Sequence, residues 1–285
     1  MNPVRKRKKK SPNEALLRGL TAVSVTAAVL ATAVFLLIPR ENTTRNTRPT
    51  VPESTVQTAP PSRIPANPYG PEDFTYEGDF LVCTAADAIP GVDVSSHQGE
   101  IDWAQVRDAG MEFAMIRLGY RGYTSGGIYE DEYAVANLTG AKNAGLSVGA
   151  YFYSQAITAE EARMEARLCI SILDGMALDL PLVYDWEYVS EDARTANMDR
   201  QTLMECTLAF CQEVEAAGYE AMIYFNPTLA ESLLDLEELT DYPWWLAMYS
   251  SSMTYPHAIA MWQYTASGTV PGIPGNTDVN LLFPN

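Results

Sequence analysis

Apolar residues recur along the chain with two patterns, one typical of strands and one typical of helices. From about residue 89 onward, stretches with one pattern alternate with stretches with the other. Short continuous apolar runs are typical of buried strands, and the stretches between them place apolar residues at helical intervals. Strands are predicted at residues 91–94, 113–118, 147–153, 182–185 and 221–225. Helices are predicted near residues 103–109, 130–143, 159–173, 200–217 and 228–234.

The pattern changes after residue 234, where three more strands are predicted without full helices between them, at residues 244–248, 260–263 and 278–282. Gly110, Gly145 and Gly218 stand where helices should end. Alternating strands and helices favour a parallel sheet with right-handed crossovers. Five strand–helix units and three bare strands therefore predict an α/β fold, an irregular TIM-like barrel of eight strands that lacks some of its outer helices.

The N-terminal part of the chain has the pattern of a membrane anchor. Residues 1–18 include a basic block, and residues 19–38 carry no charge over a length that would span a bilayer core as a helix. The basic side is expected in the cytoplasm and the rest of the chain outside it, as a single-pass membrane protein. A signal peptide cleaved near Ala31–Ala33, which would give a secreted protein, is the alternative. Because the apolar run continues through residues 34–38, we favour the anchor.

The anchor is followed by a change of composition. Residues 39–68 are rich in Pro and Thr, with few large apolar residues, which predicts a disordered linker. Residues 69–88 are a lead-in segment in which Phe74, Tyr76 and Phe80 are expected to pack on the domain. Residues 89–285 are the predicted folded domain, and we expect a monomer.

Charge is unevenly distributed along the chain, whose formal net charge is −17. Residues 91–285 carry 8 Lys and Arg against 28 Asp and Glu, and neither Lys nor Arg follows Arg200. Such a surface repels nucleic acid and anionic lipid, so both are excluded as partners of the folded part. The expected substrate is neutral or recognised by shape.

The chain has four cysteines, Cys83, Cys169, Cys206 and Cys211, and two histidines. No cysteine pair has the C-x-x-C spacing of a zinc site, so no metal or other cofactor is expected. Buried free thiols are the first interpretation, and one disulfide stays open.

Two carboxylates, Asp185 and Glu187, follow an apolar run at residues 180–184. Side chains alternate along a strand, so both acids point to the same side and Trp186 points to the other. Two acids this close at the end of a buried strand cannot both ionise easily, and a glycosidase needs one protonated and one ionised acid. The simpler alternative is that these acids cap the next helix or lie in water.

More polar and aromatic residues stand at the predicted strand ends. In a barrel of this kind the active face is the carboxyl end of the strands. Asp93 and Asp278 are predicted to join Asp185 and Glu187 there. Aromatic rings can stack on sugar rings. The expected substrate-binding residues are Tyr120, Tyr151, Tyr153, Tyr249 and Trp262.

Four stretches resemble glycoside hydrolase family 25, the N-acetylmuramidases (lysozymes). They read GVDVSSHQGEIDW at residues 91–103, LVYDWE at 182–187, MWQY at 261–264 and GNTDVN at 275–280. Their order matches that of the family over about residues 89–283. The resemblance implies a (β/α)5(β)3 barrel that cuts the β-1,4 bond between N-acetylmuramic acid and N-acetylglucosamine in peptidoglycan.

The resemblance also implies roles for the acids. Glu187 would be the general acid, Asp185 would orient the substrate acetamide or stabilise charge, and Asp93 and Asp278 would complete the cluster. The nucleophile, either the acetamide oxygen or a water, is left open, although the placement of Asp185 beside Glu187 favours substrate assistance. The alternative function is a non-catalytic peptidoglycan-binding module on the same barrel.

Overall fold

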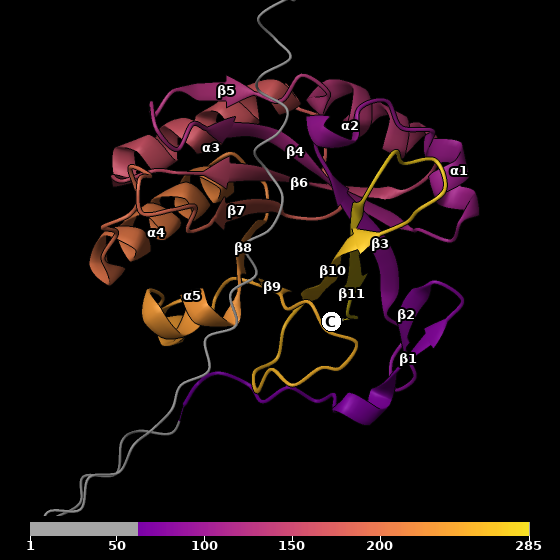
Figure 1. The fold of residues 1–285 in the computed structure, drawn as a ribbon. Helices are drawn as coiled ribbons and strands as arrows, with labels where there is room; N and C mark the ends of the chain where they lie inside the picture. The colour runs from indigo at the N-terminus through magenta and orange to yellow at the C-terminus, as the bar shows by residue number, and fades with distance from the viewer. Residues whose placement is uncertain (1–61, 285) are drawn as a thin grey trace, which may run out of the picture. The chain divides into compact units, whose positions relative to one another are not determined.

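The computed structural model describes residues 62–284 (Figure 1). Its core is a closed barrel of eight strands. In chain order these are β3 (Ile89–Val94), β4 (Phe113–Arg121), β6 (Ser147–Ser154), β7 (Leu182–Trp186), β8 (Ala221–Phe225), β9 (Trp244–Ala247), β10 (Met261–Gly268) and β11 (Thr277–Leu282).

The order of hydrogen-bonded strands is β3-β11-β10-β9-β8-β7-β6-β4, and a further pairing of β3 with β4 closes the ring. β11 runs antiparallel to both of its neighbours, while the other pairs in the ring are parallel. A short strand that the pattern did not predict, β5 (Ile128–Glu130), pairs with the end of β4 outside the ring. The predicted eight-stranded barrel is confirmed.

Five α-helices follow the first five barrel strands. They are α1 (Trp103–Asp108), α2 (Ala134–Asn143), α3 (Ala159–Leu173), α4 (Arg200–Ala216) and α5 (Pro227–Ser232). The side chains of Thr158 and Asp199 accept hydrogen bonds from the first turns of α3 and α4. Gly145 and Gly218 end α2 and α4 with positive φ angles of 84° and 86°, as their positions predicted.

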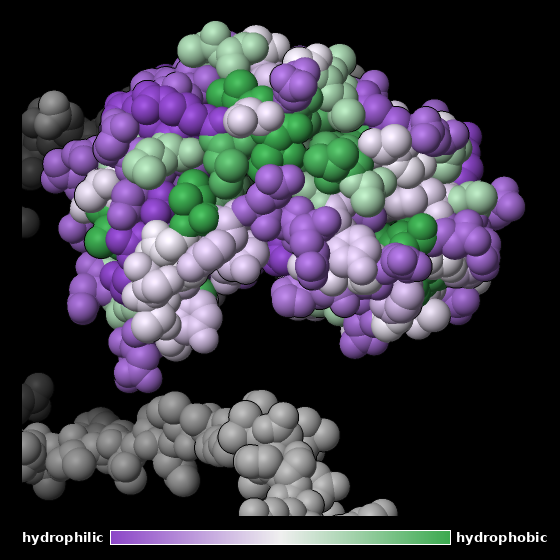
Figure 2. Space-filling model, turned by 90° about the horizontal axis from the view of Figure 1, so that it is seen from above, coloured by the Kyte–Doolittle hydropathy of each residue, from purple (hydrophilic) through white to green (hydrophobic). Residues whose placement is uncertain are grey.

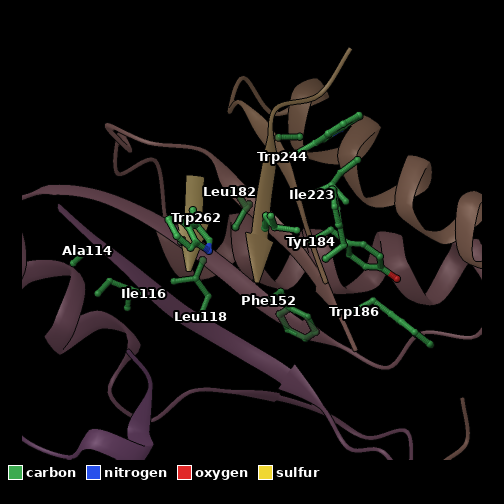
Figure 3. Close-up of a cluster of buried hydrophobic side chains, with 14 of the residues drawn as sticks. Ala114, Ile116, Leu118, Phe152, Leu182, Tyr184, Trp186, Ile223, Trp244 and Trp262 are labelled. Carbon is green, nitrogen blue, oxygen red and sulfur yellow. The ribbon is translucent and has the colours of Figure 1, made fainter. Parts of the chain in front are cut away.

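Each barrel strand presents apolar side chains on both of its faces. The outward residues pack beneath the helices, and α2, α3 and α4 lie on the outer faces of β4 to β8 (Figure 1). Figure 3 shows ten outward residues in one apolar cluster: Ala114, Ile116, Leu118, Phe152, Leu182, Tyr184, Trp186, Ile223, Trp244 and Trp262.

The inward residues fill the barrel with a second, smaller cluster. It contains Phe113, Met115, Tyr151, Val183, Met222, Tyr224, Trp245, Ala247 and Met261. Gly91 allows this packing because a Cβ atom there would lie 2.3 Å from the ring of Phe113. The barrel interior is therefore packed at one end, which leaves the carboxyl end of the parallel strands for polar groups.

The lead-in segment forms a hairpin of β1 (Phe74–Glu77) and β2 (Phe80–Cys83). The ring of Phe74 lies edge-on to that of Trp262, with 5.1 Å between their centroids, and the backbone N–H of Leu81 donates to the Tyr264 hydroxyl. This hairpin covers the outer face of β10, where no helix lies. Phe74 and Phe80 pack on the domain as expected, but the expectation for Tyr76 was wrong, since its side chain is 53% exposed.

The surface of the domain mixes polar and apolar residues, with apolar ones gathered toward the middle of the face shown in Figure 2. All four cysteines are free thiols, and three of them are buried. The predicted cytoplasmic tail, the anchor at residues 19–38 and the linker as far as residue 61 lie outside the described residues. Within residues 62–284, no helix combines the length and the apolar character that crossing a bilayer requires.

Candidate active site

β7 carries two of the predicted acids to the carboxyl end of the barrel. Val183 belongs to the inner cluster while Tyr184 and Trp186 belong to the outer one, so the alternation of the strand points Asp185 inward. Asp185 is only 5% exposed. Glu187 follows directly after the strand and is half-buried.

The other two acids lie opposite each other on neighbouring strands. Asp93 of β3 is the register partner of Asp278 of β11, and this pair is antiparallel. Although β11 runs in the opposite direction, its second residue, Asp278, therefore lies at the same end of the barrel as the last residues of β3. Asp93, Asp185, Glu187 and Asp278 line one pocket of about 120 Å³, and Tyr151, Tyr153 and Tyr249 line it with them. The structure thus brings the four predicted acids together.

Asp93 lies in a network of buried hydrogen bonds. Its Oδ2 accepts from the side-chain amides of Gln263 and Asn280, each at 2.8 Å. The same amides are oriented by further donors: the Trp245 indole donates to Asn280, and the hydroxyls of Tyr224 and Tyr249 donate to Gln263. Burial and the charge of Asp278 raise the pKa of Asp93 well above its usual range, and the two amide hydrogen bonds act against this rise.

Asp185 differs from Asp93 in its hydrogen bonding. Its Oδ1 is buried and has no hydrogen-bond partner among the described residues. Burial, followed by the negative charges of Glu187 and Asp93, raises the pKa of Asp185 well above its usual range, and the positive charge of Arg117 opposes the rise. A buried carboxyl oxygen without a donor is poised either to keep a proton or to accept a hydrogen bond from a ligand.

Glu187 combines access to the pocket with a raised pKa. Burial is the largest cause of that rise and the charge of Asp278 the second. The backbone carbonyl of Glu187 accepts a hydrogen bond of 2.8 Å from the buried amide of Gln155, whose own oxygen accepts from the Thr195 hydroxyl. Gln155 therefore fixes the backbone that carries Glu187, just beyond the point where the strand pairing stops.

Asp278 completes the cluster, and burial raises its pKa to about 6. All four acids thus have pKa values above those of free carboxyl groups, mainly because they are buried, and neighbouring negative charges add to the rise for Asp93, Asp185 and Glu187. The pocket can supply both a protonated acid and a carboxylate near neutral pH.

Two of the residues predicted to contact the substrate, Trp262 and Tyr120, do not line the acid pocket. Trp262 is fully buried on the outer face of β10, where its indole donates to the Met248 carbonyl, so it does not line the acid pocket. The inward residue of that motif is Gln263. Tyr120 lies at the end of β4 and lines a neighbouring pocket.

Sequence reasoning left out several residues that shape this site. Gln263 and Asn280 were part of the quoted motifs. Asn280 lies two residues after Asp278, which signals the same strand face, whereas the face of Gln263 depends on the register of β10. Gln155 and Tyr224 carry no signal of their own, because their contacts depend on distant strands meeting. Among residues 62–284, no group of three or more His, Cys, Asp or Glu side chains is arranged to hold a metal ion.

Comparison with known proteins decides the family. The model of glycosyl hydrolases family 25 matches residues 92–273, which is more than half of the chain. The chain belongs to this family. It is a glycoside hydrolase, and the matched range contains Asp93, Asp185 and Glu187, while Asp278 and the β1–β2 hairpin lie outside it.

Similar proteins of this family come from several bacteria. The chain is 29% identical to Lysozyme M1 of Streptomyces globisporus, over 67% of each chain. It is 28% identical to the autolytic lysozyme of Clostridium acetobutylicum, over 67% of this chain and 54% of that one. The modular autolysin LytC of Streptococcus pneumoniae, solved with a synthetic peptidoglycan ligand, is similar with a TM-score of 0.61 and 28% identity over 70% of this chain. The match spans 48% of LytC, about half of its length.

Proposed function

We propose that this domain is a muramidase that hydrolyses the β-1,4 bond between N-acetylmuramic acid and N-acetylglucosamine in peptidoglycan. The observation that carries the proposal is the meeting of four acids from β3, β7 and β11 in one pocket, all with raised pKa values. The lysozyme relatives and the peptidoglycan ligand bound by LytC support this choice of polymer.

Glu187 is proposed to protonate the leaving oxygen. It is half-buried at the mouth of the pocket, and its raised pKa keeps the proton available near neutral pH. As the bond between the anomeric carbon and the glycosidic oxygen breaks, the proton of Glu187 passes to that oxygen. The carboxylate that remains then takes a proton from the water that completes hydrolysis.

Asp185 is proposed to bind the acetamide group of the sugar being cut. Its unpartnered Oδ1 would accept a hydrogen bond from the acetamide N–H and thereby turn the acetamide oxygen toward the anomeric carbon. The oxygen would form a bond to that carbon as the glycosidic bond breaks, and water would then open the resulting ring. Substrate assistance of this kind needs no second carboxylate across the sugar ring.

Asp93 and Asp278 are proposed to stabilise the positive charge that develops on the sugar. The two amide donors to Asp93 favour its ionised form against the burial that raises its pKa, and that form would place a negative charge near the reacting carbon. The charge of Asp278 also raises the pKa of Glu187 and so helps it to stay protonated.

The composition of residues 1–61 indicates where this activity would take place in relation to the cell membrane. We infer that residues 19–38 anchor the protein in the cell membrane and that the Pro- and Thr-rich linker presents the domain to peptidoglycan outside the cell. Membrane fractionation of the producing cell tests the inference. Full-length protein in the detergent-soluble membrane fraction is expected, whereas a mature chain that begins just after Ala33 would indicate the secreted form.

Mass spectrometry of digested peptidoglycan tests the function. Wild-type protein should release fragments that end in a reducing N-acetylmuramic acid. NMR spectra of fresh product should show the β anomer if the acetamide participates. Reducing N-acetylglucosamine ends would contradict the bond assignment. Binding of glycan without any turnover would instead indicate a binding module.

A further inference from the structure

A second pocket, here called the side pocket, opens next to the acid pocket. It has a volume of about 490 Å³ and is lined by residues 96, 97, 117, 120–125 and 153. Arg117 and Tyr153 line both pockets. A polymer bound across the acids can therefore place a substituent in the side pocket.

The charged side chains that line the side pocket are basic, unlike most charged side chains of the domain, although each is paired with a carboxylate outside the lining. Arg117 and Arg121 line it, and neither Asp nor Glu does. By contrast, residues 91–285 contain 28 acids and 8 basic residues. Placing two of these few arginines around one hollow, without an acidic wall, favours an anionic ligand there. A neutral ligand, which the overall charge predicted, does not explain this lining.

The two arginines are not equivalent. Arg121 donates to Glu165 and to the carbonyls of Gly126 and Glu161, so all three of its nitrogens are used. Arg121 thus fixes the loop that forms the pocket wall.

The guanidinium of Arg117, by contrast, has one nitrogen that is not used in a hydrogen bond to the described residues. It uses Nε and Nη2 for Asp131 and Ser96, and its Nη1 donates to no acceptor among residues 62–284. The Arg117 side chain is about nine-tenths buried, and its guanidinium lies 5.2 Å from the centroid of the Tyr120 ring. A held guanidinium with free N–H groups is suited to a carboxylate.

We propose that the side pocket binds the carboxylate-bearing substituent of a muramyl unit in the bound glycan strand, and that Arg117 Nη1 donates to this carboxylate. This inference rests on the proposed function. Each muramyl unit carries a lactyl ether, which ends either in a free carboxylate or in a peptide that has carboxylates of its own. Tyr120, Tyr123 and Tyr153 would contact the apolar parts of the substituent.

Thr124 offers a test that leaves the acids untouched. It lines the side pocket on an exposed loop, and its side chain makes no hydrogen bond to the described residues. Thr124→Asp adds a negative charge to the pocket wall, and Thr124→Asn is the uncharged control of nearly the same shape. Arg117 itself is unsuitable, because its charge also acts on Asp185.

KM and kcat are measured for both variants on three soluble glycan strands: one that carries peptides, one stripped by an amidase so that the lactyl carboxylates are free, and one stripped and then neutralised by carbodiimide coupling to ammonia. On strands with carboxylates, KM of Thr124→Asp should exceed that of Thr124→Asn by about threefold or more at low salt, and the difference should shrink in 0.5 M salt. On neutral strands the two variants should have equal KM values.

The pattern of effects identifies the carboxylate. An effect confined to peptide-bearing strands assigns the pocket to the peptide, and an effect on stripped strands assigns it to the lactyl group. Equal KM values on every strand, or the same difference on neutral strands, would overturn the inference. Failure of the wild type to cut any strand would instead contradict the proposed function, and the Kd values of the two variants for the same strands would then decide the pocket separately.

Discussion

Gln263 Nε2 donates a hydrogen bond of 2.8 Å to Asp93 Oδ2, which joins residues that are 170 positions apart in the chain. Both side chains are nearly inaccessible to solvent, with exposed fractions of 4% and 5%. The bond connects β10 to β3 across β11, the reversed strand that closes the barrel. Through this bond the closing strands act on the ionisation of Asp93, because the amide lowers a pKa that burial raises.

Loss of this bond should change the pH profile of the enzyme. Gln263→Leu removes one of the two amide donors to Asp93, which hold its pKa down against burial, so the pKa of Asp93 should rise further. If the ionised form of Asp93 is needed, the acid limb of the kcat/KM profile moves to higher pH by the same amount. Asn280→Leu is the matched variant for the second donor. If the acid limb of the kcat/KM profile is unchanged in both variants, the role proposed for ionised Asp93 is wrong.

Gln155 is expected to act on catalysis through the backbone of Glu187. Gln155→Met keeps the length of the side chain but removes its donor to the Glu187 carbonyl, so kcat should fall about tenfold with little change in KM. Gln201→Met, at an exposed glutamine of α4, is the control and should leave both constants unchanged. A rise in KM alone would show that Gln155 affects binding and does not position Glu187.

The raised pKa of Asp278 predicts how stability depends on pH. A carboxyl whose pKa is higher in the folded than in the unfolded state contributes stability at low pH, and this contribution is lost as pH rises from about 3.8 toward 6. Asp278→Asn should therefore resemble the wild type at pH 4 and be more stable by about 1 to 3 kcal/mol at pH 7.5.

Urea unfolding at the two pH values measures this difference. Asp241→Asn, at an exposed aspartate, is the control, and it should have the same effect at both pH values. If Asp278→Asn destabilised the protein at pH 7.5, Asp278 would have to be a stabilising anion, contrary to the raised pKa.

The hairpin is expected to stabilise the barrel where helices are missing. Phe74→Ala leaves a cavity against Trp262 and Phe283 and should lower the free energy of unfolding by about 3 kcal/mol. Tyr76→Ala, at an exposed side chain two residues further along the same strand, should change it by less than about 0.5 kcal/mol. Equal effects in urea unfolding would mean that the hairpin does not cover β10 in solution.

Much of the barrel follows from the sequence because its strands and helices have strong local patterns. The predicted bounds of α3 match the structure at both ends, and Gly218 ends α4 as expected. β5 was not predicted because three residues are too short for a recognisable pattern. The hairpin was not predicted because it packs on Trp262 and Tyr264, which lie far along the chain.

The site was predicted less completely than the fold. The spacing of Asp185 and Glu187 places both on one face without knowledge of the barrel. In β10, by contrast, both faces are buried, so alternation alone cannot say whether Trp262 or Gln263 points inward. The register of β10 with β9 and β11 decides this, and that register is a tertiary property.

The role of Glu187 as the general acid is tested by the rate at which Glu187→Gln releases reducing ends from peptidoglycan at pH 6, compared with the wild type. Because glutamine cannot donate the proton, kcat should fall at least about a hundredfold, while the circular dichroism spectrum and the Kd for glycan strands stay the same. A Glu187→Gln enzyme that keeps wild-type kcat would contradict the central claim, since the proton would then come from another group.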